Sequence, residues 1–126
     1  MKLKLKILRF LAILPLLLLG AFCHTSCTKI DTPPMLEIKV VNTNGQAVSG
    51  VMVALFNGLD EWSMLENPVQ VWRETDTDGK VLFIDMIEEI YYFYADGDSL
   101  SNIGHEIKLL EPLRMNEKRQ VTVTVE

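Results

Sequence analysis

The feature that most constrains the fold is a regular alternation of apolar and polar residues in two distant segments. In residues 36–41, Leu36, Ile38 and Val40 are separated by other side chains, and in residues 120–126 three valines alternate with polar residues. Successive side chains of a β-strand point to opposite faces, so this period of two is typical of strands with one buried face. Both segments are therefore predicted to be half-buried antiparallel strands.

Five further segments carry strand patterns, and turn residues separate them. The Asn-Gly pair at 44–45 and the Asp-Gly pair at 78–79 supply the positive φ that tight hairpin turns require. The longest interruption, residues 57–68, is predicted to be a loop with one helical turn around 61–65. Seven strands without a long helix predict an all-β fold of two facing antiparallel sheets. The five additional strands are predicted at residues 51–56, 69–75, 81–84, 90–95 and 106–110.

Three segments resemble the carboxypeptidase regulatory-like and Cna-B-like modules, namely VVNTNGQAVSGVMVALF, TDTDGKVLF and YYFYA. These modules are prealbumin-like or Ig-like sandwiches of seven antiparallel strands, and the resemblance implies that fold here. It implies no particular activity, because such modules serve many functions. The family includes small lipoproteins of the Bacteroidota cell envelope. The residues at the matching positions are Gly45, Val48, Gly50, Val53, Thr75, Asp76, Gly79, Phe83 and Tyr91 or Tyr92.

The N-terminal segment indicates export. Four basic residues lie within residues 2–9, and an uncharged, leucine-rich run of 14 residues, interrupted by Pro15, occupies 10–23. A helix that spans a bilayer needs about 20 apolar residues, and proline kinks a helix. The run is therefore predicted to be the apolar region of a cleaved signal peptide rather than an uncleaved signal anchor.

The two cysteines of the chain, Cys23 and Cys27, follow this run. The segment resembles a bacterial lipoprotein signal, in which a small residue precedes a cysteine that receives fatty acyl chains such as palmitate. Cys27 follows a serine and is the predicted lipidation site, whereas Cys23 follows the bulky Phe22 and is the alternative. A Cys23–Cys27 disulfide is a further alternative for an exported chain.

A lipidated cysteine would attach the protein to a membrane without a spanning segment. The predicted location is the cell envelope, most simply the outer membrane on its periplasmic or surface side. The predicted organisation is a lipoprotein signal peptide at 1–26, a lipidated N-terminus and tether at 27–34, and a β-sandwich domain at 35–126.

Charge excludes one class of partner. Residues 1–26 hold four of the 12 Lys and Arg and none of the 17 Asp and Glu, so the remaining 100 residues carry a formal charge of −9. Phosphate contacts need a basic face, and nucleic acid is therefore not an expected partner.

Residues 91–94 form the densest aromatic run. In a strand Tyr91 and Phe93 share one face while Tyr92 and Tyr94 share the other, so one pair is predicted to be core and the other to lie on a sheet face. Aromatic side chains on a face can bind a glycan or a protein, although aromatic residues favour strands in any case and ordinary packing also explains them. The possible binding residues are Trp62, Trp72, Tyr92 and Tyr94.

Motifs for catalysis and metal binding are weak. Asp76-x-Asp78-Gly79 resembles part of a calcium loop, lacks its further ligands, and is predicted to stabilise a hairpin turn. His105 is the one histidine after residue 26, and no nucleophile elbow or Cys-His pairing is present. No catalytic residue, metal or cofactor is predicted.

The sequence thus predicts a non-enzymatic, membrane-anchored module that contacts an envelope protein or serves a structural role. The alternative is an accessory lipoprotein that binds carbohydrate through exposed aromatic residues. An exposed, coplanar aromatic pair would favour the alternative, and burial of these side chains would favour protein interaction.

Overall fold

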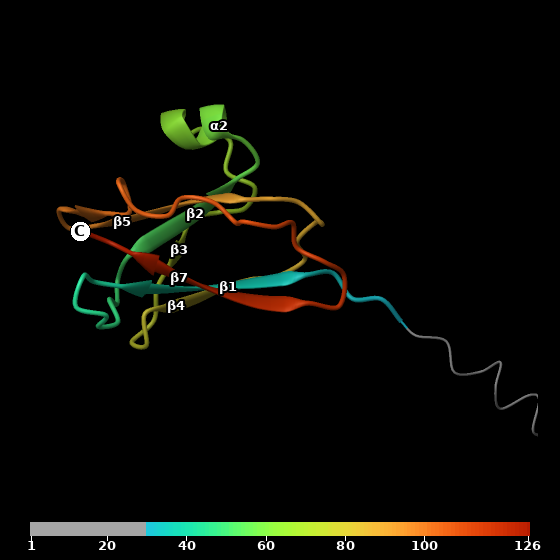
Figure 1. Ribbon diagram of the computed structural model, residues 1–126, viewed down its shortest axis with the longest axis horizontal. Coiled ribbons are helices and arrows are strands. Elements are labelled where there is room, and N and C mark those ends of the chain that lie inside the picture. The colour runs from blue at the N-terminus through green and yellow to red at the C-terminus, as the bar shows by residue number, and fades with distance from the viewer. Residues whose placement is uncertain (1–29) are drawn as a thin grey trace, which may run out of the picture. The chain divides into compact units, whose positions relative to one another are not determined.

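The computed structural model describes residues 30–126, which form seven strands, one short helix and their connecting loops (Figure 1). The predicted signal peptide, Cys23 and Cys27 lie outside the described residues. None of the helices in the described part of the chain is long and apolar enough to cross a membrane. The elements are β1 (Met35–Val41), β2 (Met52–Phe56), α2 (Leu59–Met64), β3 (Arg73–Glu74), β4 (Lys80–Phe83), β5 (Tyr92–Gly97), β6 (Leu100–Ser101) and β7 (Lys118–Thr124).

The strands form two sheets, as the alternation predicts. Within residues 30–126 the first sheet has the order β4-β1-β7 and the second has the order β3-β2-β5-β6. The two sheets lie one above the other in Figure 1, with α2 beyond the second sheet. This arrangement confirms the mostly-β, two-sheet architecture.

The prediction of antiparallel pairing throughout is wrong for one pair. β1 and β7 are parallel, with Met35 opposite Lys118 and Val41 opposite Thr124. The first and last strands are neighbours in the same sheet and run in the same direction, and the chain between them forms the second sheet and β4. Side-chain alternation looks the same in a parallel and an antiparallel half-buried strand, so the sequence pattern could not distinguish them.

The core lies between the inner faces of the sheets. Leu36, Ile38 and Val40 of β1 are fully buried, as their spacing predicts, and so are Phe83 of β4 and Phe93 of β5. These side chains alternate with more exposed ones along each strand, which is the pattern of a sheet with one face in the core.

Two predicted strands differ from the observed ones, and one observed strand was not predicted. The segment 69–75 pairs with β2 only at Arg73–Glu74, and 106–110 forms a single bridge, between Tyr92 and Lys108. β6 was not predicted, because two residues after a turn are too short to show a period. The helical turn predicted around 61–65 is present as α2, and it covers a face of the second sheet.

Loops at one end of the strands hold the start of the described chain. The backbone N–H of Thr32 donates to Asn116 Oδ1 at 2.7 Å, and the N–H of Asn116 donates to the Thr32 carbonyl at 2.9 Å. The carbonyl of Pro34 accepts from the N–H of Met86. Contacts of the fold therefore begin at residues 31–34, within the segment predicted to be a tether.

Candidate functional site

The outer face of the second sheet carries the aromatic residues singled out in the sequence. Ala54 and Phe56 of β2 lie opposite Tyr94 and Tyr92 of β5 in the antiparallel register. Tyr91 and Phe93 are buried in the core, so the outward pair is Tyr92 and Tyr94. Ala54 and Phe56 also face outward and yet are fully buried. Another part of the chain must therefore cover them.

The cover is the segment between β2 and β3, which includes α2. The Phe56 ring meets the Trp72 ring edge to face, with 6.4 Å between centroids. The Trp62 ring, carried by α2, meets the Tyr94 ring at 6.2 Å. Trp72 and Tyr94 complete the chain of contacts at 6.1 Å. We call Phe56, Trp62, Trp72 and Tyr94 the aromatic cluster.

Trp62 fixes α2 on the sheet. Its indole N–H donates to the Phe93 carbonyl at 2.9 Å, and the same carbonyl accepts from the side-chain amide of the buried Asn102. A six-residue helix is marginal by itself, and α2 has no side-chain N-cap. Its position therefore depends on this hydrogen bond and on the ring contacts of Trp62.

The structure brings together three of the four residues predicted to bind a partner. Trp62, Trp72 and Tyr94 belong to the aromatic cluster, whereas Tyr92 lies two residues along β5 and bridges to Lys108. Neighbouring rings of the cluster are inclined by 65° to 80°. Such edge-to-face contacts bury ring faces against one another, so the cluster is a small second core, in which Phe56 is fully buried and the other three rings are partly buried.

Apolar side chains are exposed on the outside of this cover. Leu59 and Met64 of α2 are each more than half exposed, and Leu65, which follows the helix, is exposed with a positive φ of 53°. A bulky residue in the left-handed region is strained, and here it ends the helix by donating its N–H to the carbonyls of Glu61 and Trp62. The segment thus presents apolar side chains to solvent on a fixed backbone.

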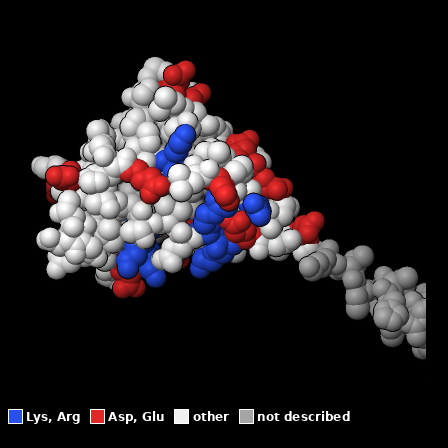
Figure 2. Space-filling view, in the orientation of Figure 1, with Lys and Arg blue, Asp and Glu red and all other residues white. Residues whose placement is uncertain are grey.

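On the face seen in Figure 2, basic groups lie among acidic ones. Lys118 contacts Glu37 at 3.6 Å, and Arg114 contacts Glu111 at 3.9 Å. The Arg114–Glu111 pair is exposed on both sides, and exposed pairs contribute little to stability.

The Asp76 motif acts as a turn, as predicted. The Asp76 carboxylate accepts from the N–H groups of Asp78 and Lys80 at 2.9 and 3.0 Å, and its carbonyl accepts from Gly79. Among residues 30–126 no group of three His, Cys, Asp or Glu side chains is placed to hold a metal ion.

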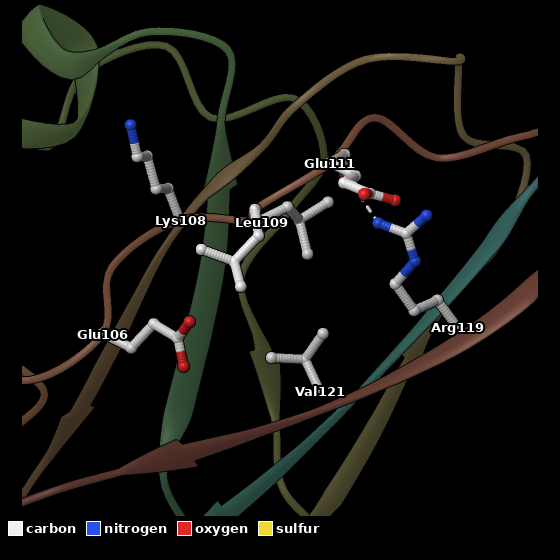
Figure 3. A pocket seen from close by; sticks show the side chains of 7 residues that line it. Glu106, Lys108, Leu109, Glu111, Arg119 and Val121 are labelled. Atoms are coloured by element: carbon white, nitrogen blue, oxygen red, sulfur yellow. Dashed lines mark hydrogen bonds between the residues drawn. The ribbon is translucent and has the colours of Figure 1, made fainter.

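A second surface was missed by the sequence analysis. A groove of about 310 Å³ separates β7 from residues 106–111, and Val121 and Arg119 project from β7 toward that segment (Figure 3). Arg119 closes one end by donating to the carbonyls of Glu111 and Pro112. The valine alternation identified β7, but the weak pattern of 106–110 gave no indication that it leaves β7 uncovered. The groove is lined by Glu106, Lys108, Leu109, Leu110, Glu111, Arg119 and Val121.

No family model and no curated protein matches the chain. Among solved structures, it is similar to the group B streptococcus pilus 2b backbone protein, with 15% identity and a TM-score of 0.49 over 74% of this chain. It is also similar to BcpA, the major pilin subunit of Bacillus cereus, with 12% identity and a TM-score of 0.47 over 75% of this chain. The chain spans 40% of the first of these proteins and 30% of the second.

Proposed function

We propose that the protein is a cell-envelope lipoprotein, acylated at Cys27, that acts as a non-enzymatic protein-interaction module. The observation that carries the interaction role is the cover formed by α2. Trp62 holds the helix on the sheet, and the helix and the residue after it expose Leu59, Met64 and Leu65. Exposed apolar side chains on a fixed element are typical of protein-binding surfaces.

The inclined rings favour a protein over a glycan as the partner. Sugar rings stack on open, flat aromatic faces, and neighbouring rings of the aromatic cluster instead present edges to one another. The Trp62 indole N–H is already engaged by the Phe93 carbonyl, so it is not available to a sugar hydroxyl. Carbohydrate binding remains the second candidate, with Tyr92 as the aromatic side chain outside the cluster.

The hydrogen bonds of residues 31–34 support a short linker between Cys27 and the folded domain. Because Asn116 holds Asp31 and Thr32, only residues 28–30 lie between Cys27 and the fold. Four Cα–Cα steps span at most roughly 14 Å. An acylated Cys27 would therefore keep the loops around Asn116 near the membrane surface. The α2 surface would then be presented close to the membrane.

The anchor is tested by intact-mass analysis of protein from the membrane fraction. We expect a mass that includes acyl chains in the parent protein and in Cys23→Ala, and no acylated species in Cys27→Ala. An acylated Cys27→Ala protein would move the anchor to Cys23. An unacylated parent protein would refute the lipoprotein.

The interaction surface is tested by a photo-crosslinking residue at position 64, with position 43 in an exposed turn as the matched control. We expect a discrete envelope protein to be captured in cells from position 64 and not from position 43. Equal capture from both positions would contradict a specific α2 surface. Binding to a glycan array that is lost in Tyr92→Ala would instead support the carbohydrate alternative.

A further inference from the structure

β7 lies at the edge of the first sheet. β7 is seven residues long and pairs with β1 on one side. The N–H of Val125 donates to Val41 and the carbonyl of Glu117 accepts from Met35, so odd-numbered residues direct their backbone groups toward β1. In a parallel pair the intervening residues direct theirs to the opposite edge. Gln120, Thr122 and Thr124 therefore present N–H and C=O groups away from β1.

Glu126, which follows β7 on the same edge, already pairs with another part of the chain. Glu126 donates its N–H to Ser101 and accepts from the Ser101 N–H, at 2.9 and 3.2 Å. This reciprocal pair is the antiparallel hydrogen-bonded arrangement. Beyond Ser101 the chain leaves β7 and joins β5, where Phe93 donates to Ile107 and Leu109 donates to Tyr91. Within residues 30–126 no strand continues the pairing along Gln120 and Thr122.

The other edges in the described part of the chain are short or covered. β3 and β6 have two residues each. β4 has four, and the Arg73 guanidinium, which also lies over the Phe83 ring, donates to the Leu82 carbonyl there. β7 has neither a proline nor a bulge in its pairing, and such features are the usual protection of an edge.

We propose that the groove beside β7 binds an extended peptide segment of another protein as an added antiparallel strand. Gln120 and Thr122 repeat donors and acceptors about 6.8 Å apart, a spacing that a polypeptide backbone matches. Leu109, Leu110 and Val121 line the groove, so alternate residues of the peptide are apolar. Leu110 is 83% exposed and would be covered by the added strand. This role goes beyond the proposed α2 surface and does not depend on acylation.

The test uses the mature chain from residue 27 with Cys27→Ser, which contains both sheets and their core. Hydrogen exchange followed by NMR should show fast exchange at Gln120 and Thr122 and slow exchange at Val121 and Val123. The probes are short synthetic peptides with Val, Ile or Leu at alternate positions and Thr or Lys between. We expect binding peptides to slow Gln120 and Thr122 about tenfold or more. The same peptides N-methylated along one edge should not bind.

Thr122→Pro removes an outward N–H without removing a bond to β1, and Thr122→Val keeps that N–H. We expect the first variant to lose peptide binding and the second to retain it. If Thr122→Pro does not fold, the exchange experiment on the parent chain decides. The proposal would be overturned by slow exchange at Gln120 and Thr122 without peptide or by no peptide binding at millimolar concentration. It would also be overturned if peptides slowed amide exchange only in α2. If exchange at Gln120 and Thr122 slows without peptide as the protein concentration rises, the edge pairs with a second copy of the chain instead.

Discussion

Two glycines in turns show how the backbone of this fold constrains single residues. Gly45 and Gly79 both adopt a positive φ, at 80° and 74°. A Cβ added at Gly79 would lie 2.7 Å from the Val40 carbonyl oxygen, whereas one added at Gly45 would meet nothing within 4 Å. The Gly79 carbonyl also accepts from the Val40 N–H at 2.7 Å. The two positions therefore share a backbone requirement and differ in available space.

We expect Gly79→Ala to destabilise the fold more than Gly45→Ala. Both variants place a side chain in the left-handed region, which costs about 1–2 kcal/mol. Gly79→Ala must in addition displace backbone, so its free energy of unfolding should fall by roughly 1–3 kcal/mol more. Urea denaturation of the two variants measures the difference. Equal losses would show that the strand at Val40 moves freely to accommodate a methyl group.

Tyr91 makes the free energy of unfolding depend on pH in the alkaline range. Burial raises the pKa of its hydroxyl above the ordinary value of 10.0, which outweighs the opposing effect of the hydrogen bond from the Ile87 backbone, and the charge of Glu89 raises it further. The hydroxyl also donates to the Ile87 carbonyl. The unfolded chain thus loses this proton at lower pH than the folded one, and stability falls as the pH rises above about 10.

We expect the free energy of unfolding to fall more steeply in the parent protein than in Tyr91→Phe as the pH rises above about 10. Near neutral pH the variant should be less stable by about 1–2 kcal/mol, because the Ile87 N–H and C=O lose their partner. Parallel pH profiles for the parent and Tyr91→Phe would contradict a titrating Tyr91.

At the scale of elements, α2 is expected to open as a local unit. Trp62→Phe keeps a ring on Tyr94 but removes the N–H that donates to the Phe93 carbonyl, and Trp62→Ala removes both. We expect amide exchange in residues 59–65 to accelerate modestly in the first variant and strongly in the second, while β1 and β7 keep their protection. Exchange measured by NMR checks this. Loss of protection in every strand of Trp62→Ala would show that α2 is part of the global unfolding unit.

The elements also show what could be predicted from sequence. The inward positions of β1 and β7 follow from the period of two, and the turns at 44–45 and 78–79 follow from their glycines. The parallel pairing of β1 with β7 could not be predicted, because strand order depends on contacts between residues more than 80 positions apart. The cover formed by α2 was equally hidden: Trp62 and Trp72 were recognised as aromatic residues, but the carbonyl that accepts from Trp62 belongs to a distant strand.

The whole molecule has two ends, and the proposed anchor would distinguish them. Loops 84–91 and 109–117 lie at the end where the described chain begins, since Asn116 contacts Thr32, Met86 contacts Pro34 and Leu113 contacts Glu89. The turn at 43–45 follows β1 and lies at the opposite end, roughly 20 Å along the strand. The linker of residues 28–30 is shorter than this separation, so an acylated Cys27 would hold one end of the domain closer to the membrane than the other.

This orientation is measurable with one fluorophore at a time. In the proposed lipoprotein, acylation would block the Cys27 sulfur and cleavage would remove Cys23, so Leu110→Cys or Asn44→Cys would carry the one free thiol of the mature protein. In vesicles that contain a membrane-bound acceptor dye, we expect more energy transfer from position 110 than from position 44. Asn116→Ala removes the side-chain hydrogen bonds to Asp31 and Thr32 and keeps only the backbone bond from the Asn116 N–H to the Thr32 carbonyl. The start of the described chain is then held less firmly, so the difference should shrink in that background. Equal transfer from both positions with Asn116 intact would mean that the domain tumbles freely, and the hydrogen bonds at Thr32 would then have no role in presenting α2.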